Sequence, residues 1–187
     1  FALILALVRH IVLAYKAIKD GIWDRNLFVG NELRGKTLTV LGYGRIGKMV
    51  CEYAKAFKMF PMFYDPPFLA KGRKGEKEVG FYTKIDDAFR YSDIVSCHLP
   101  LNEKTEGLIT LEHFARMKPK ALFINTARGE IIRNDDLLLA LNEGYLESAA
   151  LDVLPDELNP ERRKKYIRGD ILLTPHLGGC TTESMFA

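Results

Sequence analysis

Residues 36–47, which read Lys-Thr-Leu-Thr-Val-Leu-Gly-Tyr-Gly-Arg-Ile-Gly, decide the fold of this chain. The first half of the stretch is apolar and β-branched, which predicts a short buried strand. The second half has the spacing Gly-x-Gly-x-x-Gly, and residues 45–58 follow it with helical periodicity. A strand, a glycine turn of this spacing and a helix are together the first half of a dinucleotide-binding unit.

Each residue of the glycine turn has a physical reason to be there. Gly42 would make the tight turn, Gly44 would let the backbone approach a pyrophosphate, and Gly47 would let the helix pack closely on the strand. The N–H groups of Arg45 and Ile46 would then face the phosphates at the positive end of the helix dipole. An ordinary glycine turn is the alternative interpretation.

Asp65 favours the cofactor interpretation, because it lies 18 residues after Gly47, at the end of the next predicted strand. An acid at this place accepts hydrogen bonds from an adenosine ribose and repels a 2′-phosphate, so NAD is expected rather than NADP. A methyltransferase also combines a glycine loop with an acidic strand end. The basic residues that follow are interpreted as a solvated loop rather than a phosphate clamp; they are Lys71, Arg73, Lys74 and Lys77.

Helices and strands alternate outward from this unit to both ends of the chain. Continuously apolar strands between helices predict an α/β fold of the Rossmann type, a doubly wound parallel sheet with both faces covered. We expect the core at 36–176, a helix at 1–20 that leads to a separate substrate domain, and the start of a further helix at 177–187. Helices are expected at 1–19, 45–58, 86–91, 111–117 and 134–144, with Asn134 in the cap of the last, and strands at 36–41, 60–64, 79–82, 93–98, 121–125, 149–153 and 171–173.

The composition narrows the class of protein. The chain has 187 residues, 48% apolar and 27% charged, which is a globular profile. A net charge of +3 is too small to argue for nucleic acid or a membrane as partner, and the basic run 162–165 is interpreted as a solvated face. Cys51, Cys97 and Cys180 read as reduced thiols in the cytoplasm. The chain begins without an initiator Met, so we expect a piece of a longer protein.

Polar side chains follow the ends of the last three predicted strands, where ligands bind in such sheets. Arg128 follows one strand, Glu157 follows the next, which contains Asp152, and His176 follows the last. Arg can grip a carboxylate with two hydrogen bonds, His can pass a proton to or from a substrate oxygen, and Glu can orient the His. Each residue alone has an ordinary interpretation, but together they predict hydride transfer between NAD and a 2-hydroxy acid.

The remaining histidines are weaker candidates for proton transfer. His10 and His113 fall on predicted amphipathic helices and are interpreted as surface or core residues. His98 follows a predicted strand and is expected to form part of the cofactor wall. No Cys and His spacing indicates a metal site.

The chain resembles the nucleotide-binding domain of the D-isomer-specific 2-hydroxyacid dehydrogenase family. The resemblance rests on stretches that occur in family order over nearly the whole chain: Glu32-Leu-Arg-Gly-Lys-Thr-Leu, Gly42-Tyr-Gly-Arg-Ile-Gly, Tyr64-Asp-Pro, His98-Leu-Pro-Leu, Asn125-Thr-Ala-Arg-Gly, Ala150-Leu-Asp-Val and Thr174-Pro-His-Leu-Gly-Gly. Two departures are Leu154-Pro-Asp-Glu-Leu, where many members have an aromatic residue, and a long loop at 159–170.

The resemblance implies a role for each matching residue. Arg128, Glu157 and His176 match the catalytic residues, and Asp152 matches the residue that holds the nicotinamide carboxamide. Further positions match the lining of the cofactor site: His98, Leu99, Pro100, Thr105, Thr126, Ala127 and Gly178. The resemblance also implies a small 2-hydroxy or 2-keto acid as substrate and a homodimer formed through this domain. An NAD-sensing corepressor-like protein and a dehydrogenase acting on formate or phosphite remain as alternatives.

Overall fold

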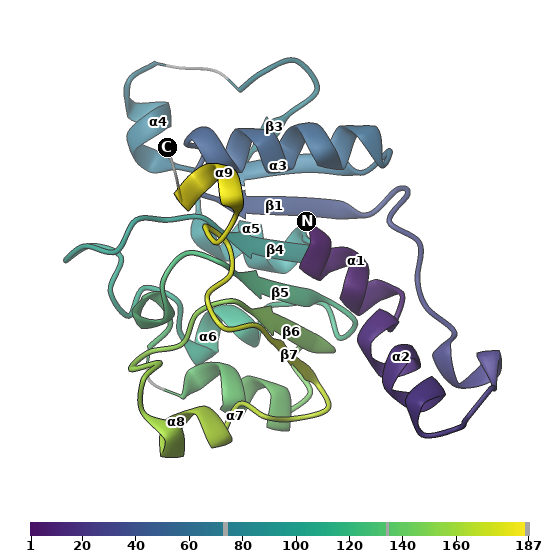
Figure 1. Ribbon diagram of the computed structural model, residues 1–187. Helices are drawn as coiled ribbons and strands as arrows, with labels where there is room; N and C mark the ends of the chain where they lie inside the picture. The colour runs from purple at the N-terminus through teal and green to yellow at the C-terminus, as the bar shows by residue number, and fades with distance from the viewer. Residues whose placement is uncertain (73–74, 134, 186–187) are drawn as a thin grey trace.

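A computed structural model describes residues 1–72, 75–133 and 135–185 of the chain (Figure 1). Its centre is a seven-stranded sheet with the order β3-β2-β1-β4-β5-β6-β7, and every neighbouring pair is parallel. The chain winds outward from β1 to β3 on one side and from β4 to β7 on the other. This is the predicted doubly wound sheet.

The strands are β1 (Thr37–Leu41), β2 (Phe60–Tyr64), β3 (Gly80–Phe81), β4 (Ile94–Cys97), β5 (Leu122–Asn125), β6 (Ser148–Leu151) and β7 (Ile171–Leu173). The helices are α1 (Ala2–Val8), α2 (Ile11–Lys19), α3 (Arg45–Ala56), α4 (Pro66–Ala70), α5 (Ile85–Tyr91), α6 (Leu111–Phe114), α7 (Asp136–Asn142), α8 (Pro160–Lys164) and α9 (Thr182–Met185). Two short 3-10 helices, η1 (Arg25–Phe28) and η2 (Gly129–Ile131), complete the elements.

The sheet divides the core in two because successive side chains of a strand point to opposite faces. In β5, Phe123 packs into one cluster with α5, α6 and α7, whereas Leu122 and Ile124 pack into the other with α1 and α3. Both faces of the central strands are therefore buried. This explains why these strands read as continuously apolar in the sequence.

The structure corrects several predicted elements. The expected helix at 1–19 is two helices, because His10 has a left-handed φ of 52° and breaks the helix between α1 and α2. The helix expected at 111–117 ends at Phe114, and the strand expected at 149–153 ends at Leu151, so that Asp152 follows the strand. Helix α8 forms within the stretch expected as a long loop, and α4 forms where no element is predicted. Asn134, Arg73 and Lys74 lie outside the described residues.

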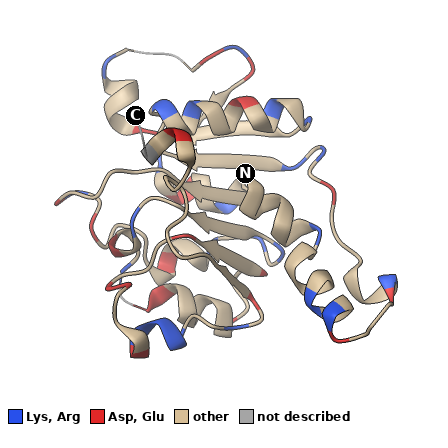
Figure 2. Cartoon of the chain, viewed as in Figure 1, with Lys and Arg blue, Asp and Glu red and all other residues tan. Residues whose placement is uncertain are grey.

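The basic run that reads as a solvated face forms much of α8 and pairs with an acid of a neighbouring element. Lys165 Nζ lies 2.9 Å from Asp135 Oδ2, and Arg162 Nη2 lies 3.8 Å from Asp135 Oδ1. Elsewhere, Lys and Arg are interspersed with Asp and Glu along the chain (Figure 2). Over the described ranges, no helix combines the length and apolar character that crossing a bilayer requires.

Helix α2 and the segment after it extend away from the sheet, and we refer to residues 11–29 as the N-terminal arm (Figure 1). Helix α2 has no buried residue, although most of its side chains are apolar. Trp23 is 89% exposed and Val29 is 78% exposed. A helix with this much uncovered apolar surface is typical of a segment that packs against another chain.

Candidate active site

The glycine turn between β1 and α3 is shaped by close backbone contacts. Gly42 has a φ of 97°, and a β-carbon there would lie 2.8 Å from the carbonyl oxygen of His98. A β-carbon on Gly47 would lie 2.1 Å from the carbonyl oxygen of Gly42. Only glycine lets the turn and the helix approach each other this closely.

Gly44 is different, because no atom lies within 4 Å of the β-carbon position and its backbone caps α3. In the hydrogen bonds of the described residues, the N–H groups of Arg45 and Ile46 donate to no backbone acceptor. The result is an open concave backbone at the positive end of a helix dipole. This arrangement fits the pyrophosphate of a dinucleotide.

Asp65 follows β2 and faces the glycine turn. Its Oδ2 accepts a hydrogen bond from the Tyr43 N–H at 2.8 Å, and its Oδ1 accepts one from the Phe68 N–H at 2.9 Å, which caps α4. An ionised carboxylate can accept about four hydrogen bonds, so acceptor capacity remains for a ribose. The position predicted to choose between NAD and NADP therefore lies beside the pyrophosphate cradle.

The loop after β4 borders the glycine turn, and it contains His98, Leu99, Pro100 and Thr105. The Thr105 hydroxyl donates to the Pro100 carbonyl at 2.5 Å and so folds the loop on itself. His98 Nε2 lies 2.9 Å from Ser96 Oγ. Burial lowers the pKa of His98 to about 4, so its ring is neutral at pH 7. A neutral ring suits a cofactor wall better than a proton donor.

Two residues that were not predicted from the sequence shape the loop of Arg128. Asn125 is fully buried at the end of β5, where its Oδ1 accepts from the Ala127 N–H at 3.0 Å and its Nδ2 donates to the Arg128 carbonyl at 2.9 Å. These bonds close the turn formed by Thr126 and Ala127. A β-carbon on Gly129 would lie 2.1 Å from the Leu154 carbonyl carbon, so glycine lets the loop that leads to Glu157 pack there.

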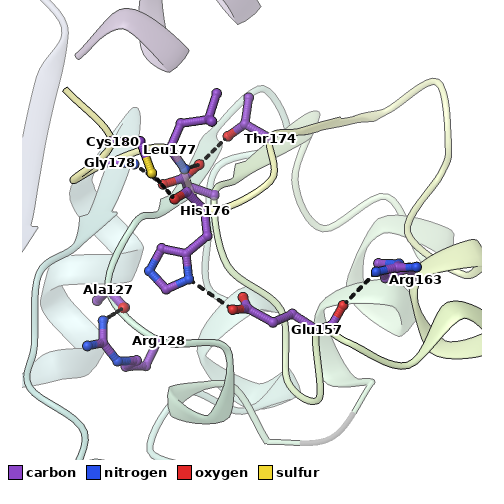
Figure 3. Close-up of polar contacts among 10 residues, drawn as sticks. Ala127, Arg128, Glu157, Arg163, Thr174, His176, Leu177, Gly178 and Cys180 are labelled. Atoms are coloured by element: carbon purple, nitrogen blue, oxygen red, sulfur yellow. Dashed lines mark hydrogen bonds and ion pairs between the residues drawn. The ribbon is translucent and has the colours of Figure 1, made fainter. Parts of the chain in front are cut away.

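His176 and Glu157 form a direct pair, with 3.0 Å between His176 Nδ1 and Glu157 Oε1 (Figure 3). Both side chains are accessible, with exposed fractions of 45% and 41%. In Figure 3 the ring of His176 stands between Arg128 and Glu157. On the far side of the pair, Arg163 Nη1 donates to the Glu157 carbonyl at 3.1 Å, so α8 also holds the acid loop.

The three residues predicted to be catalytic line one cavity of about 350 Å³, together with Leu154 and Leu158. A second cavity of about 300 Å³ is also lined by His176 and Glu157 and reaches Asp152 and Thr174. The structure thus brings Arg128, Glu157, His176 and Asp152 to one edge of the sheet. Across the described parts of the chain, no group of three or more His, Cys, Asp or Glu side chains is arranged to hold a metal ion.

Asp152 is buried directly after β6, and its oxygens accept from Thr174 Oγ1 and from the backbone N–H groups of Leu177 and Gly178. Gly178, predicted to line the cofactor, is thus in contact with the residue expected to hold the carboxamide. Thr174 was not predicted as a site residue. Its sequence signals are a place in the family-like stretch Thr174-Pro-His and a hydroxyl two residues before the histidine.

A glycine cradle at a helix N-terminus, an acid at the next strand end and an Arg, Glu and His at one sheet edge define a dinucleotide-binding domain of the dehydrogenase type. The chain belongs to the D-isomer specific 2-hydroxyacid dehydrogenase family, whose NAD binding domain model matches residues 1–178. Membership in this NAD-binding family fits the observed cradle.

Similar proteins cover almost the whole chain. It is 40% identical over 193 residues to the glyoxylate reductase of Aeropyrum pernix, covering 98% of this chain and 56% of that protein. It is 39% identical over 186 residues to the D-3-phosphoglycerate dehydrogenase of Bacillus subtilis, covering 98% of this chain and 34% of that protein. The chain thus spans about a third to just over half of these relatives.

Among solved structures, D-lactate dehydrogenase from Aquifex aeolicus in complex with NAD and lactic acid superposes with a TM-score of 0.87 at 29% identity. The match covers 100% of this chain and 60% of that one. The alternative of an NAD-sensing interaction protein gains no support from these comparisons.

Proposed function

We propose that this chain is the cofactor-binding domain of an NAD-dependent D-2-hydroxyacid dehydrogenase, which interconverts a 2-keto acid and a D-2-hydroxy acid. The observation that carries the proposal is the shared cavity of Arg128, Glu157 and His176, in which His176 Nδ1 lies 3.0 Å from Glu157 Oε1. Bound NAD supplies the hydride chemistry at the substrate carbon. The residues of the chain supply substrate binding, proton transfer and orientation.

Arg128 binds the carboxylate of the substrate. Its guanidinium has five N–H donors in a planar fork that matches a carboxylate. Its Nη1 donates to the Ala127 carbonyl at 2.6 Å, which fixes the direction of the side chain. This grip orients the neighbouring keto group toward His176.

His176 moves the proton. Its Nδ1 faces Glu157, so Nε2 is the atom that donates to the keto oxygen during reduction and accepts the hydroxyl proton during oxidation. Glu157 accepts the Nδ1 hydrogen and so leaves Nε2 as the ring atom that faces the substrate.

The cofactor would be held by the residues predicted for it. Gly42, Gly44 and Gly47 with the N–H groups of Arg45 and Ile46 bind the pyrophosphate, and Asp65 binds the adenosine ribose. Asp152 binds the nicotinamide carboxamide. The remaining wall consists of His98, Leu99, Pro100, Thr105, Thr126, Ala127, Arg128, His176 and Gly178.

The test is NADH oxidation by the full-length protein with a panel of 2-keto acids. We expect turnover with at least one of them, and His176→Gln should lower kcat by about 100-fold, the usual scale for a positioned acid. NADH affinity of the variant should stay unchanged. A full-length protein that binds NADH but reduces none of the acids would refute the proposal and favour a sensor.

A substrate domain outside residues 1–187 would complete the site. The chain covers 34% to 56% of the two relatives named above, which supports this division. Positioning a substrate is worth about 7–11 kcal/mol of barrier, so the chain alone should bind NADH but turn over poorly. Turnover by residues 1–187 at the rate of the full-length protein would contradict the two-domain division.

The enzyme is expected to be a homodimer in which the N-terminal arm of one copy packs on the other. The arm leaves Trp23, Leu27 and Val29 exposed, and an apolar groove of about 380 Å³ lies beside it, lined by Leu7, Leu13 and Leu172. One chain therefore carries both an apolar projection and an apolar groove. Sedimentation should give a dimer for the full-length protein and a monomer for its Trp23→Ser, Leu27→Ser variant.

The cytoplasm is the proposed location. The three cysteines are free, and burial raises the pKa of the Cys51 and Cys97 thiols to about 12, which leaves them unreactive. Free thiols are typical of a reducing compartment. Fractionation of cells that produce the protein should recover it with cytoplasmic markers.

A further inference from the structure

We infer that Thr174 is a positioning residue for His176, and that it acts through the buried carboxylate of Asp152. The inference rests on the function proposed above, because it concerns how the proton-transferring ring is held. It adds a residue to the site that neither touches the substrate nor belongs to the predicted cofactor lining.

Three donors converge on Asp152, which is only 4% exposed. Its Oδ1 accepts from Thr174 Oγ1 at 2.5 Å and from the Leu177 N–H at 2.8 Å, and its Oδ2 accepts from the Gly178 N–H at 2.7 Å. These donors lie on both sides of His176 in the sequence. Figure 3 shows Thr174, Leu177 and Gly178 close together beside the backbone of His176.

The backbone of His176 needs such support. Its φ of 56° lies in the left-handed region, which the β-carbon of a non-glycine residue disfavours. The other bonds of the His176 backbone are short-range: its N–H donates to the Thr174 carbonyl at 3.1 Å, and its carbonyl accepts from Cys180 Sγ at 3.5 Å. The bonds to the Asp152 carboxylate therefore hold the backbone of His176 in this left-handed conformation.

The pair with Glu157 cannot supply this support. Both side chains of the pair are more than 40% exposed. Ion pairs at such accessible positions contribute little to stability. The distance between His176 and Glu157 is therefore a result of where the backbone holds the ring, rather than the cause of it.

Substitutions of Thr174 test the hydrogen bond between its hydroxyl and Asp152. Its N–H donates to the Leu151 carbonyl at 2.9 Å, so the sheet holds its backbone independently of the hydroxyl. Thr174→Val removes the donor to Asp152 and keeps the shape of the side chain. Thr174→Ser keeps the donor. Thr181→Val is a matched control, because the Thr181 hydroxyl donates to Ser184 Oγ at 3.0 Å and not to Asp152.

The experiment measures NADH-dependent reduction by the full-length protein with a 2-keto acid that the wild type reduces. Thr174→Val should lower kcat by about tenfold to 100-fold, the cost of a misplaced catalytic group, with NADH affinity and KM changed by about twofold at most. Thr174→Ser and Thr181→Val should keep the kcat of the wild type. A kcat loss accompanied by an equal loss of NADH-binding sites would mean unfolding and would overturn the inference.

A second measurement does not depend on turnover. In the full-length protein labelled with ¹⁵N-histidine, the ring signal that disappears in His176→Gln is assigned to His176. We expect the signal of a carboxylate-bonded Nδ1 in the wild type and in Thr174→Ser, and its loss in Thr174→Val. A wild type without keto acid reduction would refute the proposed function, while these spectra would still decide the role of Thr174.

Two results would overturn the inference directly. One is a Thr174→Val protein with the kcat and the His176 signal of the wild type, which would mean that the hydroxyl bond holds nothing in place. The other is a Thr174→Ser protein as impaired as Thr174→Val, which would mean that side-chain shape matters and not the bond to Asp152.

Discussion

Replacing Gly47 and Gly44 separately by Ala should separate the packing of the glycine turn from its role in cofactor binding. In Gly47→Ala the new β-carbon would lie 2.1 Å from the Gly42 carbonyl oxygen, whereas ordinary contacts begin at 3.4 Å. The β-carbon is fixed rigidly to the backbone of α3, and the oxygen belongs to the backbone of the turn. The helix and the turn must therefore move apart by roughly 1 Å, which overpacks the contact.

The cost of Gly47→Ala can be worked out from two opposing effects. Overpacking costs about 1–3 kcal/mol, and a contact of 2.1 Å with a backbone oxygen belongs in the upper part of that range, at about 2–3 kcal/mol. The better helix propensity of Ala returns about 1 kcal/mol. The free energy of unfolding should therefore fall by about 1–2 kcal/mol. With a urea dependence of about 2 kcal/mol/M, the unfolding midpoint moves down by about 0.5–1 M.

Gly44→Ala should change stability little and weaken the binding of NADH. Nothing lies within 4 Å of its β-carbon position, and its φ of −81° is open to any residue. Losing glycine at the N-cap costs less than about 1 kcal/mol. The methyl group would stand where the pyrophosphate must approach, so NADH affinity should fall by at least about tenfold, or 1.4 kcal/mol.

The assays are urea unfolding followed by circular dichroism and NADH titration followed by fluorescence, both on the same preparations. The reasoning predicts a crossed result, with stability lost in Gly47→Ala and affinity lost in Gly44→Ala. A Gly44→Ala protein that binds NADH as tightly as the wild type would refute it. So would a Gly47→Ala protein of unchanged stability.

Three further predictions follow from single contacts. Asp65→Ser should weaken NADH binding and narrow the gap to NADPH while keeping a hydroxyl to cap α4; tighter NADPH than NADH binding by the wild type would contradict this. Burial lowers the pKa of His98 from 6.5 to about 4, so the unfolded chain takes up this proton first as the pH falls. Stability should therefore drop between pH 6.5 and 4, by up to ~3 kcal/mol from this group, and unfolding curves of His98→Gln should show a smaller drop. Gly129→Ala places a β-carbon 2.1 Å from the backbone of Leu154 and should displace the Glu157 loop, lowering kcat more than NADH affinity in steady-state and binding assays.

The sheet could be predicted closely because its signals are local. The strand over β1 is a short apolar run that stops at Gly42, and β4 and β5 carry the same kind of run. Parallel strands end at one edge, so the approach of Arg128, Glu157 and His176 followed from counting strand ends. The pair distance between Glu157 and His176 did not, because it depends on the left-handed backbones at Asp156 and His176.

Other features were missed for identifiable reasons. The apolar spacing of residues 1–19 continues through His10, so it predicts one helix although the backbone turns at that residue. Helices α4 and α8 both begin with an Asp or Asn cap followed by Pro, at Asp65 and Asn159, a start signal that was hidden by the adjacent basic and proline-rich residues. The Asn125 side chain bonds within its own loop, to Ala127 and Arg128, and the Thr174 hydroxyl bonds to Asp152 after the neighbouring strand. No periodicity in the sequence reports either kind of contact.

The strand order of the sheet has a consequence for how the protein is made. Strand β1 lies between β2 and β4, but β4 comes after β2 and β3 in the chain. As the polypeptide leaves the ribosome, β1 and β2 can pair while the other edge of β1 stays open until Ile94–Cys97 emerges. That edge is a row of unpaired N–H and C=O groups, able to join another nascent chain. We therefore expect aggregation during synthesis to begin from this half-made sheet.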